Sequence, residues 1–185
     1  MCVFNNVGYA HDADKAYFNI LEKGSTVEIT AEFPWSIRNA LLQFSPELNN
    51  AKTKDEFENA LFNYIKLNLR MFDTHNRPML LLSVKAINDE DHAHQGKYKL
   101  IFKGNYISKI SNSILFNINN NQENYHRILL DNSTFKYTTT KDVRLFEIVG
   151  RPNKSLAFYQ WGIILVGLGL IVNLFKLKRP FKFNN

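Results

Sequence analysis

Alternation of apolar and polar residues predicts a β-strand near the start of the chain, in residues 26–33. Its apolar positions are Val27, Ile29, Ala31 and Phe33, and its polar positions are Glu28, Thr30 and Glu32. This period of two is typical of a strand with one buried face. An apolar run over residues 15–21 precedes it, and the turn at residues 22–25 separates the two. We therefore expect a β-hairpin.

Two amphipathic helices are predicted next. The first begins at Ser36, which suits an N-cap, and its apolar face consists of Ile37, Ala40, Leu41, Phe44 and Leu48. The second begins with a capping box made by Thr53 and Glu56. Its apolar residues recur at helical spacing: Phe57, Leu61, Tyr64, Ile65, Leu69 and Phe72. That stripe is most simply a core face, and the polar loop 73–78 ends the helix.

The following residues have the pattern of β structure. Strands are expected over residues 79–87, around Tyr98, Leu100 and Phe102 where apolar residues alternate with lysines, and over 110–118, 126–130 and 143–149. Because the gaps between them are short, antiparallel neighbours are favoured. The predicted fold class is α+β, an antiparallel β-sheet or sandwich with two helices inserted after the second strand.

A long uncharged segment lies near the C-terminus, from Leu156 to Phe175, and contains 20 residues. At about 1.5 Å per residue it spans roughly 30 Å, the thickness of a bilayer's hydrocarbon core. Tyr159 and Trp161 lie near one end, where aromatic rings favour the membrane interface, and Lys176 follows the other end. We expect one C-terminal transmembrane helix; a buried core helix is the alternative.

The charges beside this segment predict its direction. Basic residues cluster in the tail, residues 176–185, so the positive-inside rule places that tail in the cytoplasm. Residues 11–150 are then an extracytoplasmic, periplasmic domain, joined to the span by a short linker at 151–155. Gly8 and Ala10 fit positions −3 and −1 of a cleavage site. We therefore interpret residues 1–10 as a signal-peptide remnant; an ordinary N-terminus is the alternative.

The net charge of +6 does not indicate nucleic-acid binding. Six of the 23 Lys and Arg residues lie beyond position 150, whereas all 17 Asp and Glu residues lie before it. Residues 1–150 thus carry 17 of each sign. A nucleic-acid site needs clustered positive charge. No basic stripe with interleaved aromatic residues is apparent along the sequence, so we expect no nucleic-acid partner.

Catalytic motifs are missing from the sequence. It contains no glycine-rich phosphate loop, no Gly-x-Ser-x-Gly and no His-Glu-x-x-His. The single cysteine, Cys2, lies before the predicted domain and allows no disulfide within the chain. We expect a binding or interaction module; the alternative is a membrane-anchored hydrolase with scattered site residues. A buried Ser or Asp beside His75 or His126 would favour the hydrolase.

One loop suggests metal chemistry. His92 and His94 are two positions apart and follow Asp89, Glu90 and Asp91. On an extended loop both imidazoles can point the same way, and imidazole with carboxylate suits Ni, Cu or Zn. His11 would add an amine and a ring nitrogen if it is the mature N-terminus. The candidate metal residues are therefore His92, His94, Asp91 and His11. The alternative is a solvated acidic loop.

Residues 11–72 also resemble a known kind of domain. The resemblance consists of Ala-His at the expected mature start, the strand from Val27 to Phe33, the helix containing Asn39-Ala-Leu-Leu42 and a long helix before a polar turn. This pattern is similar to the exported domain that precedes the permease part of HupE/UreJ-type proteins, and to membrane-anchored proteins of Bacteroidetes-type genomes. The resemblance implies an accessory role in transition-metal handling. With one predicted span, the chain would be a separate partner of a multi-span metal permease.

Overall fold

The computed structural model describes residues 14–87, 95–130 and 133–149, and its first two strands form the predicted hairpin. Strand β1 (Lys15–Lys23) pairs antiparallel with β2 (Thr26–Pro34). Gly24 closes the turn with φ +60°, a conformation that glycine adopts without strain. The predicted α+β class, with two helices after the second strand, is confirmed.

The helical insertion consists of α1 (Ile37–Phe44), a 3-10 turn η1 (Pro46–Asn50) and α2 (Lys54–Asn68). Helix α1 ends four residues earlier than its apolar pattern suggested, because Pro46 cannot continue an α-helix. Ser36 precedes α1, but its side chain makes no capping hydrogen bond.

Helix α2 begins at the predicted N-cap. The Thr53 hydroxyl accepts a hydrogen bond from the Glu56 N–H at 3.4 Å. The Glu56 carboxylate accepts from the Lys52 N–H at 2.9 Å, one residue before the position that a capping box uses. Two amide groups near the start of the helix are thereby satisfied.

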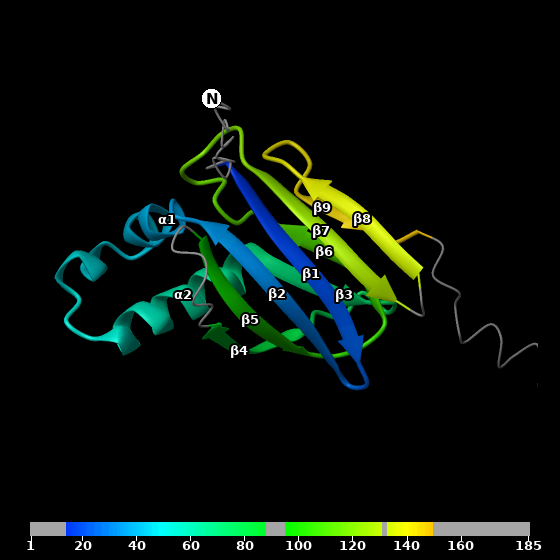
Figure 1. Ribbon diagram of the computed structural model, residues 1–185. Helices are drawn as coiled ribbons and strands as arrows, with labels where there is room; N and C mark the ends of the chain where they lie inside the picture. Colours follow the sequence, from blue (N-terminus) through cyan, green and yellow to red (C-terminus); the bar gives the residue numbers. More distant parts are fainter. Residues whose placement is uncertain (1–13, 88–94, 131–132, 150–185) are drawn as a thin grey trace, which may run out of the picture. The chain divides into compact units, whose positions relative to one another are not determined.

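A six-stranded sheet carries most of the fold (Figure 1). Its order is β4 (Leu80–Ala86), β5 (Gln95–Lys103), β2, β1, β7 (Glu123–Leu130) and β8 (Ser133–Thr139). Strands β1 and β7 are parallel, whereas the other neighbours are antiparallel. The sheet is therefore mixed rather than wholly antiparallel.

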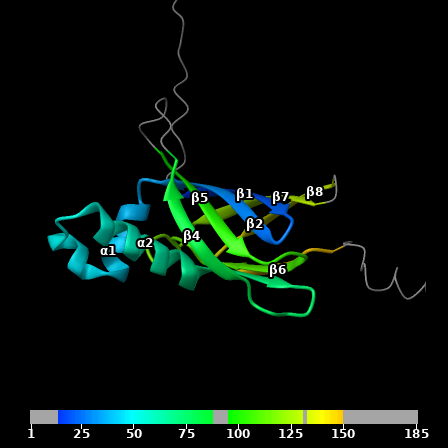
Figure 2. The same ribbon diagram turned by 90° about the horizontal axis from the view of Figure 1, so that it is seen from below.

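A second sheet packs against the inner face of the first, and the views in Figures 1 and 2 both show the two layers. It contains β3 (Leu69–Asp73), β6 (Ile107–Asn112) and β9 (Leu145–Glu147), all antiparallel. Phe18 of the large sheet, Ile110 of the small sheet and Leu61 of α2 belong to one buried apolar core. The inner face of the large sheet is thus covered, and its other face carries the polar half of each alternating strand.

Two further predicted boundaries are wrong, for identifiable reasons. The second helix ends at Asn68 rather than Phe72, because the chain turns into β3 and alternation then buries Leu69 and Met71. The predicted strand 110–118 ends at Asn112. Its continuation is a turn in which Leu115 has φ +68°. The Leu115 N–H donates to the Tyr64 hydroxyl at 2.8 Å, which ties this turn to α2.

The predicted transmembrane segment, residues 156–175, lies outside the described residues, as do the proposed signal-peptide remnant, the linker and the tail. None of the helices in the described part has the length and apolar character needed to cross a bilayer.

Candidate functional site

The predicted metal residues are not placed by the structure. His11, Asp91, His92 and His94 all lie outside the described residues. Within residues 14–87, 95–130 and 133–149, no three His, Cys, Asp or Glu side chains come together as a metal-binding group. His75 lies in the loop after β3, where its N–H donates to Asp73 Oδ1 at 2.8 Å.

His126 belongs to a buried polar cluster between the two sheets. It points inward from β7 and is 2% exposed. Its ring stacks on Phe18 of β1, with centroids 5.1 Å apart, and packs against Phe146 of β9 at 4.9 Å. Burial lowers the pKa of His126 to about 4. Nearby backbone groups of Tyr137 and Asn124 have a smaller effect in the opposite direction and raise the pKa of His126. Neither forms a hydrogen bond with His126 Nδ1. The imidazole is therefore neutral at pH 7.

The hydrogen bonds of Asn112 determine which nitrogen of His126 carries the proton. Asn112 Oδ1 accepts from the Ile114 N–H at 3.0 Å, so its Nδ2 faces His126 Nε2, also at 3.0 Å. An amide NH2 can only donate, and Nε2 must accept. The proton then lies on Nδ1. Asn124 extends the cluster by donating to Asn112 Oδ1 at 3.3 Å.

Among the described residues, neither His75 nor His126 has the buried Ser or Asp that the hydrolase alternative required. Asp73, beside His75, is only partly buried and pairs with Arg77. No Ser or Asp side chain is hydrogen-bonded to His126. The polar groups bonded around His126 are the side-chain amides of Asn112, Asn124 and Gln122. Amides hold a ring in place but do not supply a nucleophile. Phe18 and Phe146 pack against the imidazole, which leaves His126 2% exposed.

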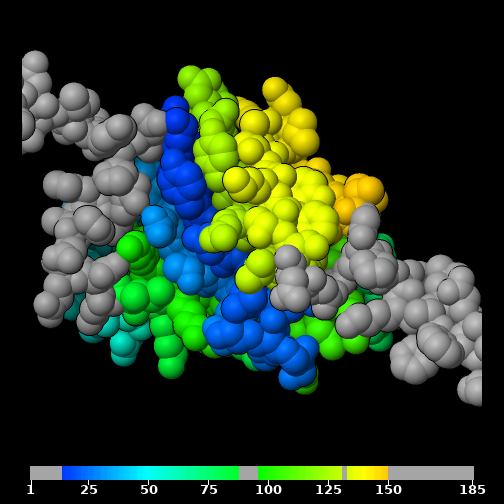
Figure 3. All heavy atoms as spheres, turned by 45° about the vertical axis from the view of Figure 1, so that its right-hand side comes forward, coloured from blue at the N-terminus to red at the C-terminus, as the bar shows by residue number. Residues whose placement is uncertain are grey.

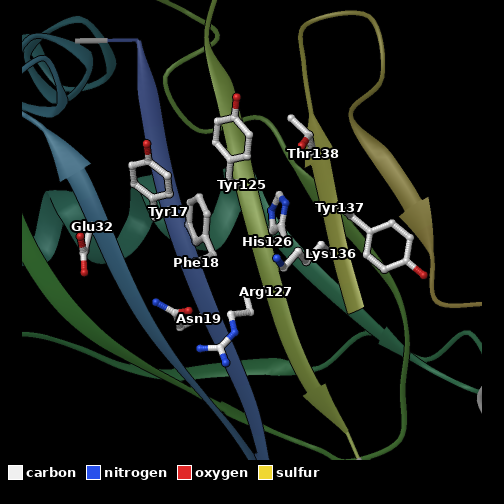
Figure 4. Close-up of a pocket in the computed structure, with 10 residues that line it drawn as sticks. All are labelled: Tyr17, Phe18, Asn19, Glu32, Tyr125, His126, Arg127, Lys136, Tyr137 and Thr138. Carbon is white, nitrogen blue, oxygen red and sulfur yellow. The ribbon is translucent and has the colours of Figure 1, made fainter. Parts of the chain in front are cut away.

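A groove of about 640 Å³ opens on the other side of the same strands. Its outward-facing lining comes from four neighbouring strands: Tyr17 and Asn19 of β1, Glu32 of β2, Tyr125 and Arg127 of β7, and Lys136 and Thr138 of β8. Figure 4 shows these side chains rising from adjacent strands. Figure 3 shows β1, β7 and β8 adjoining on this face. We define these seven side chains as the outer-face groove.

Two tyrosines form the aromatic part of the groove. Tyr17 and Tyr125 are partners in the parallel β1–β7 register, and their rings stack with centroids 5.5 Å apart and 19° between planes. The Tyr125 hydroxyl donates to the Glu123 carboxylate, which raises the pKa of Tyr125. The pair is therefore fixed in orientation, with each ring covering one face of the other.

Two cationic side chains form the second part of the outer-face groove. Arg127 and Lys136 lie directly opposite each other in the β7–β8 register. Like charges in that position destabilise a sheet unless something compensates them. Among the described residues, neither forms an ion pair with a carboxylate. An anion bound between them would supply the missing charge.

The whole outer face of the large sheet shares this positive character. The outward-facing positions of its described strands carry eight basic residues and three acidic ones. The basic residues are Lys15, Lys23, Lys85, Lys97, Lys99, Lys103, Arg127 and Lys136, and the acidic ones are Glu28, Glu32 and Glu123. Residues 1–150 carry equal numbers of basic and acidic residues, but the fold places most of the outward-facing charges of the large sheet as basic residues on one face. This uneven distribution cannot be read from the charge balance of the sequence.

The sequence predicted three of the four strands of the groove, β1, β2 and β7, but not the groove itself. Alternation around Tyr17 and around Arg127 marks these side chains as outward-facing. It does not indicate that β1 and β7, which are about a hundred residues apart, lie side by side. The Thr-rich stretch that contains Lys136 is also a strand, β8, although no strand was predicted there.

No protein-family model matches this chain, and a search of curated proteins finds no match either. The resemblance of residues 11–72 to HupE/UreJ-type proteins consequently stays a prediction.

Proposed function

We propose that this protein is a single-span membrane protein whose extracytoplasmic domain is a non-catalytic binding module, with the outer-face groove as its ligand site. The membrane helix is the segment from Leu156 to Phe175, and its direction follows from the basic tail. The ligand class that the groove favours is one with an anionic group.

The opposed pair of Arg127 and Lys136 carries this proposal. Both side chains are exposed, so their charges are accessible to a ligand. Arg presents a planar fork of N–H donors that fits a carboxylate or phosphate, and Lys adds a point charge. Tyr17 and Tyr125 offer an aromatic wall beside them. A groove with aromatic surface and a few polar groups is typical of ligand sites.

The chemistry of His126 makes the hydrolase alternative less favourable. A general base must lie within hydrogen-bonding reach of the proton it removes. His126 is 2% exposed, and its Nε2 already accepts from Asn112. Its low pKa has a structural cause, which is burial among aromatic rings.

The test is a titration of the ¹⁵N-labelled full chain, in neutral detergent micelles, with galacturonate and with inorganic phosphate. We expect amide shifts confined to β1, β7 and β8, with millimolar affinity of about −4 kcal/mol. The variant Arg127→Gln/Lys136→Gln should lose these shifts. Lys52→Gln/Lys66→Gln, which removes the same charge from exposed positions in and before α2, should retain them. Shifts that are absent for both anions, or equal in the two variants, would contradict the proposal.

The role as an accessory to a metal permease is a second candidate, favoured by the sequence of the loop that contains Asp91, His92 and His94. The two imidazoles of the loop alone would give a site of at most micromolar affinity, about −8 kcal/mol, and His11 could supply a further ligand if it is the mature N-terminus. Calorimetric titration with Ni²⁺, Cu²⁺ and Zn²⁺ tests it. Equal heats for the natural chain and for His92→Ala/His94→Ala would remove the loop from consideration.

A further inference from the structure

One row of outward-facing residues crosses all six strands of the large sheet. From β4 to β8, the successive register partners are Lys85, Lys99, Thr30, Asn19, Arg127 and Lys136. Neighbouring strands lie about 4.8 Å apart, so the row is roughly 24 Å long. It contains four cations and no acidic residue. We call it the cross-strand row.

The charges of the cross-strand row are intermittent. One pair of cations, Lys85 and Lys99, lies at one end, and Arg127 and Lys136 lie at the other. Two neutral hydrogen-bonding side chains separate the pairs. Glu28, in the next row, accepts from Lys99 at 3.1 Å and from Lys23 at 2.8 Å, and these contacts lower the pKa of Glu28. A single carboxylate thus compensates part of one pair only.

We propose that the cross-strand row binds an acidic polysaccharide, lying across the strands with its carboxylates over the two cation pairs. This inference rests on the proposed function and specifies its ligand. In polymers such as hyaluronan only every second sugar ring carries a carboxylate, so neutral rings rich in hydroxyl groups separate the charges. Thr30 and Asn19, between the cation pairs, can donate and accept hydrogen bonds to hydroxyls. The order of cation pair, neutral residues and cation pair along the row therefore matches the order of acidic and neutral rings along the polymer.

A single-stranded nucleic acid fits this face less well. It carries a phosphate on every nucleotide, and its bases need open aromatic faces on which to stack. Tyr17 and Tyr125 cover each other's facing sides, and the Tyr125 hydroxyl is bonded to Glu123. Glu32 would moreover place a carboxylate beside a continuous line of phosphates.

The test compares four probes on the full chain in neutral detergent micelles. They are a hyaluronan hexasaccharide (the hexamer), which carries three carboxylates, galacturonate as the monomeric acid, maltohexaose as the neutral glycan and a dT4 oligonucleotide with three phosphates. The hexamer should bind at least about tenfold more tightly than galacturonate, because it contacts both cation pairs at once. Maltohexaose should bind no more tightly than galacturonate. Raising NaCl from about 50 to about 200 mM should weaken hexamer binding.

Variants at the two ends of the row make the test specific. Lys85→Gln/Lys99→Gln should weaken hexamer binding about fivefold or more and leave the galacturonate-induced amide shifts of β1, β7 and β8 unchanged, since that pair lies outside the groove. Lys52→Gln/Lys66→Gln, with the same charge change, should alter hexamer binding less than about twofold. Unchanged amide spectra confirm that each exposed substitution leaves the fold intact.

Several outcomes would overturn the inference. A hexamer that binds no more tightly than galacturonate would exclude a polymer on the row while leaving the groove as an anion site. Tighter binding of dT4 than of the hexamer, at equal charge, would assign the face to nucleic acid. Equal losses in the row and control variants would indicate non-specific attraction. If galacturonate also fails to bind, the proposed function fails with the inference.

Discussion

His126 is a residue whose protonation opposes folding. In the folded chain its pKa is about 4, whereas in an unfolded chain it is about 6.5. Between these values the unfolded state binds more protons than the folded state, so stability rises with pH across this window. Protonation would also place two N–H donors, those of Asn112 and His126, against each other. The imidazole is thus tolerated in the core only in its neutral form.

We predict that acidification from pH 6.5 to 4 removes about 3 kcal/mol of stability through His126. In His126→Phe, an aromatic ring still fills the space between Phe18 and Phe146, but it cannot titrate. The difference in unfolding free energy between the natural chain and this variant should therefore shrink or reverse as pH falls. Urea unfolding of the full chain, followed by circular dichroism, measures it. The exposed substitution His75→Phe serves as control, and an equal pH dependence in all three proteins would refute the assignment.

Two glycines with positive φ offer a matched comparison. Gly24 has φ +60° and open space where a Cβ would lie, whereas Gly104 has φ +143° and a Cβ there would be 2.8 Å from Met79 Cγ. We expect Gly24→Ala to cost about 1 kcal/mol, the penalty of the left-handed conformation alone. Gly104→Ala should cost about 3 kcal/mol or more, because Met79 must also move. Thermal unfolding would show the order, and similar losses would contradict it.

At the scale of elements, the N-terminus of α2 depends on one hydroxyl. Thr53 accepts from the Glu56 N–H, so Thr53→Ala should destabilise the protein by about 1 kcal/mol. Thr53→Ser keeps the acceptor and should cost less than about half as much. Hydrogen exchange of the first-turn amides of α2 gives a local measurement. Faster exchange in the Ser variant than in the Ala variant would argue against the cap.

Local patterns predicted elements well where one face of a single segment is buried. The alternation in β2 and the stripe in α2 gave the correct types, and Thr53 the correct start. The pattern misled at Leu69, because a residue at helical spacing from Ile65 also suits the first inward position of a strand. Tertiary pairing of β3 with β6 decided between the two.

The site could be predicted much less completely. Outward positions such as Tyr17 and Arg127 follow from alternation, but their adjacency depends on the parallel pairing of β1 with β7. No periodicity within a strand specifies which distant strand becomes its neighbour. The cross-strand row is the extreme case. It takes one residue from each of six strands. Because these residues are spread along the sequence, no cluster of basic residues along the chain predicts the positive charge of the row.

At the scale of the whole molecule, the proposed topology makes a direct prediction. Lys176, Lys178 and Arg179 follow the uncharged segment, and such clusters are retained on the cytoplasmic side. The described domain should then face away from the cytoplasm. A cysteine introduced in the domain should react with a membrane-impermeant maleimide on intact spheroplasts, and one in the tail should react only after lysis.

The substitutions for this test follow from exposure and from the single natural cysteine. With Cys2→Ser as background, Leu67→Cys uses a position on α2 that is 64% exposed, and Asn184→Cys uses the tail. We expect the maleimide to label the Leu67→Cys protein in intact spheroplasts. It should label the Asn184→Cys protein only after permeabilisation. Leu41→Cys, at a position that is 0% exposed, controls for folding and should label only after denaturation. Labelling of the tail in intact cells, with protection of the Leu67→Cys protein, would invert the topology. The cross-strand row would then face the cytoplasm, where nucleic acids rather than acidic polysaccharides are the abundant polyanions.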